Sequence, residues 1–471
     1  MAAPKSIVPI AQERPFAIFE LFFSTTDQRG VIRYGNEVFS RIAGYPLADM
    51  VGKPHNLIRH PDMPKAVFRL VWDYLHRGRT VAGYVKNMAS DGRYYWVLAI
   101  IMPCGDGYLS VRLKPSSDVF AVVQGAYAKL LQVEQEATAA GASPKEAMDA
   151  SAGKLMELLA SLGFPSYDEF MWAALTAEMT SRSKLLAAGD SAGTVTEPDR
   201  RSARAGAMGD RERLLALFAR SQVLDRQLGD LFARPGTFSQ LRNEIIPKAN
   251  FIVRIGSDIR VQSINAQIEA SRLGESARAL AMVAERLGKH AGEGIATVEE
   301  LNGRLRKLTT PIAELIFNSM VSKIQIEMAA SFVREILATA DDAHGDAERA
   351  QNLATNLQLL FRSFLDTARR TPAALQQLQG ELARVGKEIQ ELCRFMRTLH
   401  FIYFTGKVET ARQNNSQSFI TIFDQIKAMI HESDTVLSQL QEQIIANREQ
   451  LGSIGNIDGR VFDELDSLIA A

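Results

Sequence analysis

The chain has 471 residues, a length that favours roughly three domains over one. With 46% hydrophobic and 23% charged residues it has a globular composition, which excludes wholesale disorder. The 54 basic and 54 acidic side chains cancel, so there is no overall field to hold nucleic acid or an acidic membrane surface. Only Cys104 and Cys393 occur, and no apolar run approaches the length of a membrane span or a secretion signal. We expect a soluble cytoplasmic protein with neither disulfides nor a cysteine-based metal site.

The first 118 residues hold most of the prolines and tyrosines, a composition that suits strands and turns. A hairpin is predicted where Ser24–Thr26 and Val31–Tyr34 flank a turn that ends in Gly30. Helical stretches and then a meander of strands follow: helices Asn36–Ile42 and Pro64–His76, and strands Ala82–Met88, Tyr94–Met102 and Tyr108–Lys114. For residues 1–118 we predict an α+β domain, an antiparallel sheet whose helices cover one face and leave a cavity.

Beyond residue 119 the apolar residues recur at every third or fourth position, which predicts a large all-α region of helical hairpins and bundles. Residues 119–188 are predicted to be a helical linker region, and the polar, glycine-containing stretch 189–209 a flexible linker. Residues 210–310 are predicted to form a helical hairpin that turns near Gly274. Its second arm is expected to end at Pro311, because proline breaks the interior of a helix.

The last part, residues 311–471, is predicted to be a helical bundle with a second hairpin that turns near 413–416. A weak internal repeat supports this prediction: Ile268–Arg272 (IEASR) recurs as Val408–Arg412 (VETAR), and each is followed by a polar turn and a new apolar helix. Two similar hairpins would pack into a bundle rather than extend as one rod. Chance similarity between two amphipathic helices is the alternative explanation.

A string in the first segment is distinctive. Residues Asn56–Ala66 read NLIRHPDMPKA, with Trp72, Asn87 and Trp96 at set distances after it. This pattern resembles the flavin-binding PAS domain of bacterial aerotaxis receptors, over about residues 20–117. In that family the domain holds FAD non-covalently and senses the redox state of the respiratory chain. The resemblance implies a redox or oxygen sensor with a PAS fold.

The resemblance also implies which residues bind the cofactor. Arg59, His60 and Asp62 match the family's flavin-dependent motif, while Trp72 and Asn87 match residues that line its cavity. A guanidinium or imidazolium offers charge-assisted hydrogen bonds to a diphosphate or a reduced ring. An amide can both donate and accept at the pyrimidine edge, and an indole supplies a flat apolar wall.

Other interpretations of these residues stay open. Arg59 and Asp62 could pair with each other and cap the helix at Pro64, and Trp72 could be an ordinary core residue. Haem is the alternative cofactor, because neutral imidazole is a common ligand of haem iron and three histidines lie nearby: His55, His60 and His76. Residues 54–64 contain no cysteine, so a light-driven bond between flavin and a thiol is not expected.

A second string lies at the predicted turn of the first hairpin. Residues Ile264–Glu275 (INAQIEASRLGE), followed by Ala281–Glu285, resemble the signalling tip of methyl-accepting chemotaxis proteins. In that family the tip binds a coupling protein and a histidine kinase. The resemblance implies partner-facing roles for four polar residues: Asn265, Glu269, Arg272 and Glu275.

The flanks of this string depart from the family pattern. Ser257 stands where the family has the aromatic residue used for packing receptors into trimers, and Arg260 stands where it has an asparagine that contacts the kinase. Neither arm carries a clear run of methyl-accepting Glu/Gln pairs.

The leading hypothesis is therefore a non-enzymatic, homodimeric energy sensor with FAD in its PAS domain and a chemoreceptor-type helical output. The alternative is a PAS scaffold or dimerisation protein without cofactor. No glycine-rich phosphate loop, nucleophile elbow or HExxH motif supports an enzyme, and no metal site is expected.

Overall fold

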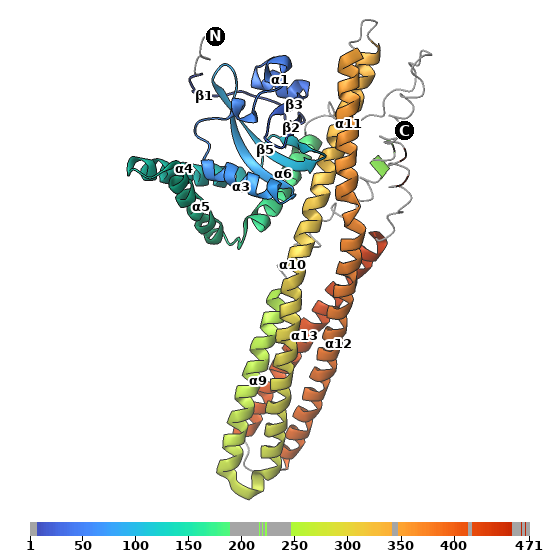
Figure 1. Cartoon of the computed structure of the whole chain (residues 1–471). Helices are drawn as coiled ribbons and strands as arrows, with labels where there is room; N and C mark the ends of the chain where they lie inside the picture. The colour runs from blue at the N-terminus through green and yellow to red at the C-terminus, as the bar shows by residue number, and fades with distance from the viewer. Residues whose placement is uncertain are drawn as a thin grey trace. The chain divides into compact units, whose positions relative to one another are not determined.

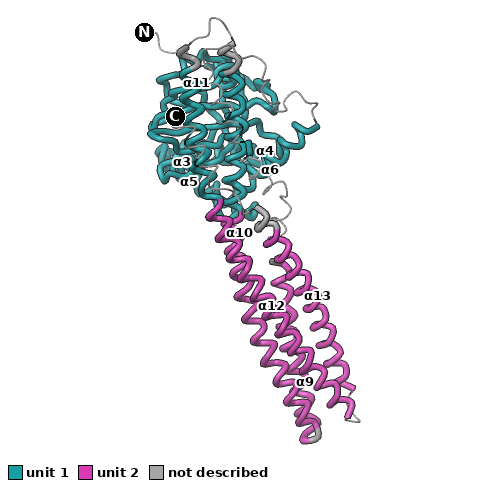
Figure 2. Tube along the Cα trace, turned by 90° about the vertical axis from the view of Figure 1, so that its right-hand side faces the viewer, with its two compact units in different colours: residues 1–229, 313–371, 457–471 teal, residues 230–312, 372–456 magenta. Residues whose placement is uncertain are grey.

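The computed structural model describes residues 7–188, 246–341, 347–412 and 417–454, with isolated positions at 216, 219, 222, 223, 463 and 467. The predicted linker 189–209 and the predicted turn 413–416 lie outside these residues. The chain divides into two compact units (Figure 2): unit 1 comprises residues 1–229, 313–371 and 457–471, and unit 2 comprises residues 230–312 and 372–456. None of the described helices is long and apolar enough to cross a membrane.

Unit 1 begins with a curled six-stranded sheet (Figure 1). Its strands are β1 (Ile10–Glu13), β2 (Phe22–Asp27), β3 (Ile32–Gly35), β4 (Val81–Met88), β5 (Arg93–Cys104) and β6 (Gly107–Leu113). The order across the sheet is β3-β2-β6-β5-β4 with antiparallel neighbours, and β1 pairs in parallel with the start of β5. The predicted hairpin and meander are confirmed. Strand β1 was not predicted, since its IAQE sequence has little β propensity.

Short helices connect the two groups of strands: α1 (Glu37–Ala43), α2 (Leu47–Met50), η1 (His55–Ile58) and α3 (Lys65–His76). Helix α1 begins at Asn36, whose side-chain oxygen accepts from the Phe39 N–H, and ends at Gly44 in the left-handed conformation. Helix α3 has a remote cap, because the Ala66 N–H donates to the buried carboxylate of Glu134 at 3.0 Å. These helices close a core around Phe22, Phe39 and Tyr95, among other residues.

The other face of the sheet, which we call the outer face, is covered first by α4 (Asp118–Ala139) and α6 (Tyr167–Ala188), with α5 (Pro144–Ser161) between them in the chain. The ring of Trp96 packs against Tyr127 of α4, and the Tyr127 hydroxyl donates to the Tyr84 carbonyl. Glu178 of α6 is fully buried and accepts from the Tyr84 hydroxyl at 2.8 Å and from the backbone N–H groups that precede α4. The Ser117 hydroxyl donates as well, at 2.8 Å, so each oxygen of this buried carboxylate accepts at least two hydrogen bonds.

The rest of the outer face meets the later helices α10 (Arg278–Asp341) and α11 (Ala347–Ala368), through the parts of them that belong to unit 1. The rings of Phe23 and Phe332 lie 4.7 Å apart, edge to face. The Gln325 amide donates to the sulfur of Met102 at 3.1 Å. The strands that form the cavity thus also contact α10 directly, on the opposite side of the sheet.

Unit 2 is helical throughout its described residues. It contains α9 (Ile246–Leu273), η3 (Gly274–Ala277), α10 as far as residue 312, α12 (Arg370–Ala411) and α13 (Gln417–Ile454). Gly274 has φ 71°, so it supplies the left-handed conformation at the predicted turn. The prediction that Pro311 ends a helix was wrong, because α10 continues through it to Asp341. Buried Leu308, Ile312 and Leu315 keep this part of α10 packed despite the lost hydrogen bond.

The two hairpins of unit 2 bury matching positions. On the first arms, Ile252, Ile259 and Ala266 of α9 are buried. The repeat aligns Ile252 with Leu392 and Ile259 with Leu399 of α12, and both leucines are buried too. On the second arms the correspondence is shifted by one residue: α10 buries Leu280, Leu287, Val298 and Leu301, and α13 buries Phe419, Ile426, Leu437 and Leu440. Ile420, which the repeat itself aligns with Leu280, is 41% exposed. With that shift, the sequence repeat is also a repeat in burial.

Candidate functional site

A cavity of about 370 Å³ lies between the inner face of the sheet and the short helices of unit 1. This volume is at the lower end of the range for small-molecule sites. Its main lining residues are Ser24, Thr26, Val85, Asn87, Ala99, Ile101, Tyr108, Ser110 and Arg112 from the sheet, and His55, Asn56, Arg59, Phe68, Val71, Trp72 and Leu75 from the helices and the loop between them. Apolar walls with a few polar groups are typical of a cofactor site.

Three of the five predicted cofactor residues line this cavity: Arg59, Trp72 and Asn87. A backbone bridge joins Arg59 to Asn87, which brings the loop against the middle of the sheet. The guanidinium of Arg59 lies over the Phe68 ring at 4.1 Å and donates to the Met63 carbonyl at 3.0 Å. Burial lowers the pKa of Arg59, and the carboxylate of Glu134 partly opposes that effect.

His60 and Asp62 are not among the residues that line the cavity. The buried His60 ring accepts from the Asp62 backbone N–H at 3.1 Å, and the Asp62 carboxylate binds the ammonium of Lys86 at 2.7 Å. Burial and then the Lys86 charge lower the pKa of His60. These contacts hold the loop against β4, and that loop carries Arg59. In this structure His60 and Asp62 therefore position Arg59, which lines the cavity, and do not line it themselves.

Arg112 is a lining residue that the sequence analysis missed. It lies on β6 and is 4% exposed. Its Nη2 donates to the Ser24 hydroxyl at 2.9 Å and lies 2.7 Å from Nε2 of His55. Burial lowers the pKa of His55 to about 3, so the neutral imidazole accepts this hydrogen bond. Burial lowers the pKa of Arg112 only to about 10, which leaves it charged at neutral pH.

Part of this buried charge has no partner. Within the described residues, Nη1 of Arg112 and the hydroxyl of Ser110 lack any hydrogen bond. Leaving buried polar groups unpaired costs about 1–3 kcal/mol each. Ser110 and Arg112 are two positions apart on β6 and therefore lie on the same face of the strand. This spacing of polar residues was the signal in the sequence that could have identified Arg112 as a lining residue. The cavity therefore offers a charged donor and a hydroxyl to a ligand with acceptor atoms.

This donor set fits a flavin better than haem. A flavin's pyrimidine edge presents adjacent acceptors and a donor, which Arg112, Ser110 and Asn87 could satisfy. Of the histidines in the described chain, His55 alone lines the cavity, and its Nε2 is held by Arg112. His60 is engaged with Asp62, and no group of three or more His, Cys, Asp or Glu among the described residues is placed to hold a metal ion.

The thiol of Cys104 does not line the cavity. Burial raises its pKa to about 11, so it stays protonated and unreactive at neutral pH.

The predicted partner-facing residues lie together near the turn of the first hairpin of unit 2. Asn265, Glu269 and Arg272 are on α9 and Glu275 is in η3. The Arg272 side chain is 74% exposed and pairs with Glu269 at 3.2 Å. The Asn265 amide donates to Gln262 at 3.2 Å. These contacts are local, so the polar groups remain accessible to another protein.

Comparison with known proteins supports the PAS fold predicted for the first domain. Residues 32–107 match a family model described as the PAS fold, and the strand order and cavity above complete that fold. Over 124 residues the chain is 38% identical to the aerotaxis receptor of Escherichia coli, covering 25% of this chain and 24% of that protein. Over 100 residues it is 32% identical to the biofilm dispersion protein BdlA of Pseudomonas aeruginosa, covering 21% of this chain and 24% of that protein.

A solved PAS domain of a protein from Colwellia psychrerythraea overlaps 21% of this chain and 86% of that chain, with 20% identity and a TM-score of 0.18. The chain spans about a quarter of the length of the curated relatives it matches. It thus has an N-terminal PAS domain similar to that of an aerotaxis receptor, followed by a large helical region.

Proposed function

We propose that this chain is a cytoplasmic redox or oxygen sensor whose PAS domain binds FAD. The observation that carries the proposal is the buried, charged Arg112, which has an unpaired N–H beside the unpaired Ser110 hydroxyl in the cavity. A bound flavin would supply one- or two-electron redox chemistry at its ring. A cavity of about 370 Å³ suits that ring, with the rest of the dinucleotide lying outside it.

The lining residues have distinct roles in this proposal. Arg112 favours extra negative charge on the ligand, since a guanidinium in a low-dielectric site interacts strongly with an anion. Asn87 can donate and accept at the ring edge, and Trp72 forms an apolar wall. Arg59 can neutralise a phosphate, while His60 and Asp62 hold the loop in place.

The opposite face of the sheet offers a route for the signal. Arg112 donates to Ser24 of β2, and the neighbouring residue Phe23 packs on Phe332 of α10. A ligand whose charge changes on reduction would favour one arrangement of Arg112, and such a preference can shift the contact with α10. The output would be contact of Asn265, Glu269, Arg272 and Glu275 with a chemotaxis coupling protein and histidine kinase, in a homodimer.

Absorption spectroscopy of the purified full-length protein tests this proposal. We expect a flavin spectrum in air that bleaches on chemical reduction, and loss of that colour in Arg112→Met. Arg33→Met is the matched control, because Arg33 lies in the same domain but pairs with Asp106 at the surface. A sharp haem band, or a colourless wild type that cannot be reconstituted with FAD, would contradict the proposal.

A scaffold without cofactor is the second candidate. Exposed apolar side chains on unit 2 favour a protein that works through contacts, for example Phe401 at 74% exposure. A scaffold would purify colourless and still self-associate, so the same spectrum separates the two functions.

A further inference from the structure

Glu134 of α4 is a buried carboxylate that reaches the start of α3. It is 6% exposed and accepts from the Ala66 N–H at 3.0 Å. Among the described residues this N–H is the one group that donates to it. Glu178, the other buried carboxylate of the described chain, accepts from the hydroxyls of Tyr84 and Ser117 and from two backbone N–H groups. Glu134 is therefore stabilised largely by nearby positive charge rather than by hydrogen bonds.

Two sources of positive charge lie beside Glu134. The first is the N-terminus of α3, where the N–H groups of the first turn carry a partial positive charge. The second is Arg59, whose guanidinium lies over the Phe68 ring at 4.1 Å and donates to the Met63 carbonyl at 3.0 Å. Phe68 and Ala66 belong to the same first turn of α3. Burial lowers the pKa of Arg59, and the Glu134 carboxylate opposes this effect, as an anion close to the guanidinium does.

Arg59 also faces the ligand. It lines the cavity together with Phe68 and Trp72 of α3, and in the proposed function it neutralises a phosphate of FAD. That phosphate and the carboxylate of Glu134 are then two anions that share one guanidinium. In a partly buried site the repulsion between like charges is stronger than in water. Each anion therefore weakens the attraction of the other to Arg59.

We propose that Glu134 is a specificity-determining residue of the cavity, whose charge opposes the phosphates of a bound flavin and so limits the affinity for FAD. This inference rests on the proposed function, because it requires a flavin in the cavity. The opposition is reciprocal, since a coupling between two sites changes both affinities by the same factor. A phosphate-bearing flavin therefore loosens the contact between α4 and the start of α3, whereas a flavin without phosphate leaves it in place.

Helix α4 connects this contact to the rest of the domain. Its first half packs on the outer face of the sheet, where the Tyr127 hydroxyl donates to the Tyr84 carbonyl. Its second half carries Glu134 and packs on α5, whose Ser151 hydroxyl donates to the Leu130 carbonyl. A loosened contact at Glu134 thus reports to α4 and α5 that the phosphate end of the ligand is bound, whatever the redox state of the flavin ring.

The flavin affinities of the full-length chain, freed of flavin by dialysis, test the proposal. We expect Glu134→Gln to bind FAD and FMN about tenfold more tightly than the wild type, and riboflavin with an affinity that changes by less than about twofold. The amide oxygen of glutamine keeps an acceptor for the Ala66 N–H, so the start of α3 stays capped. FMN carries a phosphate without adenine, which separates the effect of charge from contacts of the adenine ring. Quenching of flavin fluorescence measures the three dissociation constants.

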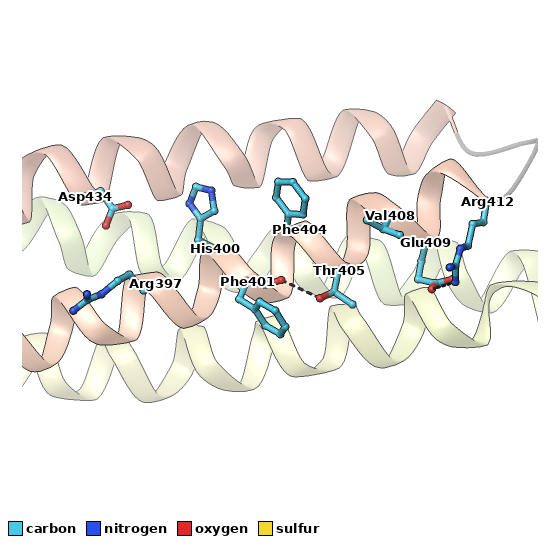
Figure 3. A pocket seen from close by; sticks show the side chains of 9 residues that line it. All are labelled: Arg397, His400, Phe401, Phe404, Thr405, Val408, Glu409, Arg412 and Asp434. Carbon is cyan, nitrogen blue, oxygen red and sulfur yellow. Dashed lines mark hydrogen bonds and ion pairs between the residues drawn. The ribbon is translucent and has the colours of Figure 1, made fainter.

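Glu409→Gln is the matched control. Glu409 also stands beside an arginine, since it pairs with Arg412 at 2.9 Å, but this pair lines a surface groove on α12 in unit 2 (Figure 3). The control removes the same charge from the chain as Glu134→Gln, so an effect of net charge alone would appear in both variants. We expect its three flavin affinities to equal those of the wild type. An equal gain for FAD in both variants would overturn the proposal.

Amide hydrogen exchange gives a readout that a purely structural cap would not produce. In the wild type, FAD should speed exchange across residues 130–138 of α4 relative to riboflavin, and in Glu134→Gln the two flavins should give the same exchange. The proposal is overturned if Glu134→Gln changes the affinities for FAD and riboflavin by the same factor, or if both flavins give the same exchange in the wild type.

The same measurements separate this proposal from the sensor proposal. A wild type that binds none of the three flavins would contradict both. A wild type that binds FAD, combined with a Glu134→Gln variant that gains no preference for FAD over riboflavin, would contradict the role of Glu134 alone.

Discussion

Two charged side chains are buried on opposite faces of the PAS sheet, and their surroundings differ. Glu178 of α6, on the outer face, accepts hydrogen bonds from the Tyr84 hydroxyl and from the N–H groups of Ser116 and Ser117. Arg112, on the inner face, has one nitrogen that no described residue pairs. A buried charge with all its partners holds a fold together, while one left partly unpaired indicates a ligand. The first therefore serves stability and the second recognition.

The largest effect should come from Glu178→Ala, which leaves two hydroxyls and two backbone N–H groups without their acceptor. We expect the free energy of unfolding of unit 1 to fall by about 3 kcal/mol or more. Urea unfolding followed by tryptophan fluorescence measures this, because all three tryptophans belong to unit 1. A loss below about 1 kcal/mol is typical of substitutions at solvent-exposed positions. Such a small loss would show that water replaces the hydrogen bonds of Glu178.

A smaller effect is expected from acidification, through His55. Its pKa is about 3 in the folded chain, against 6.5 for a free imidazole, so the unfolded chain binds more protons between these values. The free energy of unfolding should therefore fall as the pH drops from 6.5 toward 3. Between pH 6.5 and 5.5 we expect it to fall by about 1 kcal/mol. His55→Gln keeps an acceptor for Arg112 without titrating, and it should flatten the difference in unfolding free energy between pH 6.5 and 5.5. An unchanged slope in that variant would contradict a neutral His55 beside Arg112.

The smallest effect on stability should come from Arg112→Met in the ligand-free protein. The change keeps the volume of the side chain. It loses the contacts with Ser24 and His55 but also removes a buried charge with an unpaired nitrogen, and because these effects oppose each other the unfolding free energy should change by no more than about 1 kcal/mol. The same variant should lose the ligand, as measured by absorption. A loss as large as that of Glu178→Ala would place Arg112 with the residues that hold the fold rather than with those that recognise a ligand.

The sequence determined the local elements of this protein. Turn signals and strand-prone residues predicted the strands from β2 to β6, and Gly274 marked the turn between α9 and α10. These features depend on backbone preferences and on which face of an element is apolar, both of which act over a few residues. The string around Arg59 likewise indicated where the cavity would lie.

Only the tertiary structure decided which polar groups meet. The contact between His55 and Arg112, the partners of Glu178 and the exclusion of His60 from the cavity lining all join residues far apart in the chain or depend on burial. The passage of α10 through Pro311 has the same origin, because tertiary packing of Leu308 and Ile312 outweighs a local helix breaker. The exposure of Phe401 on α12 could not be predicted from the sequence for the same reason. A repeat in sequence fixes which residues correspond, but only packing decides which of them remain uncovered.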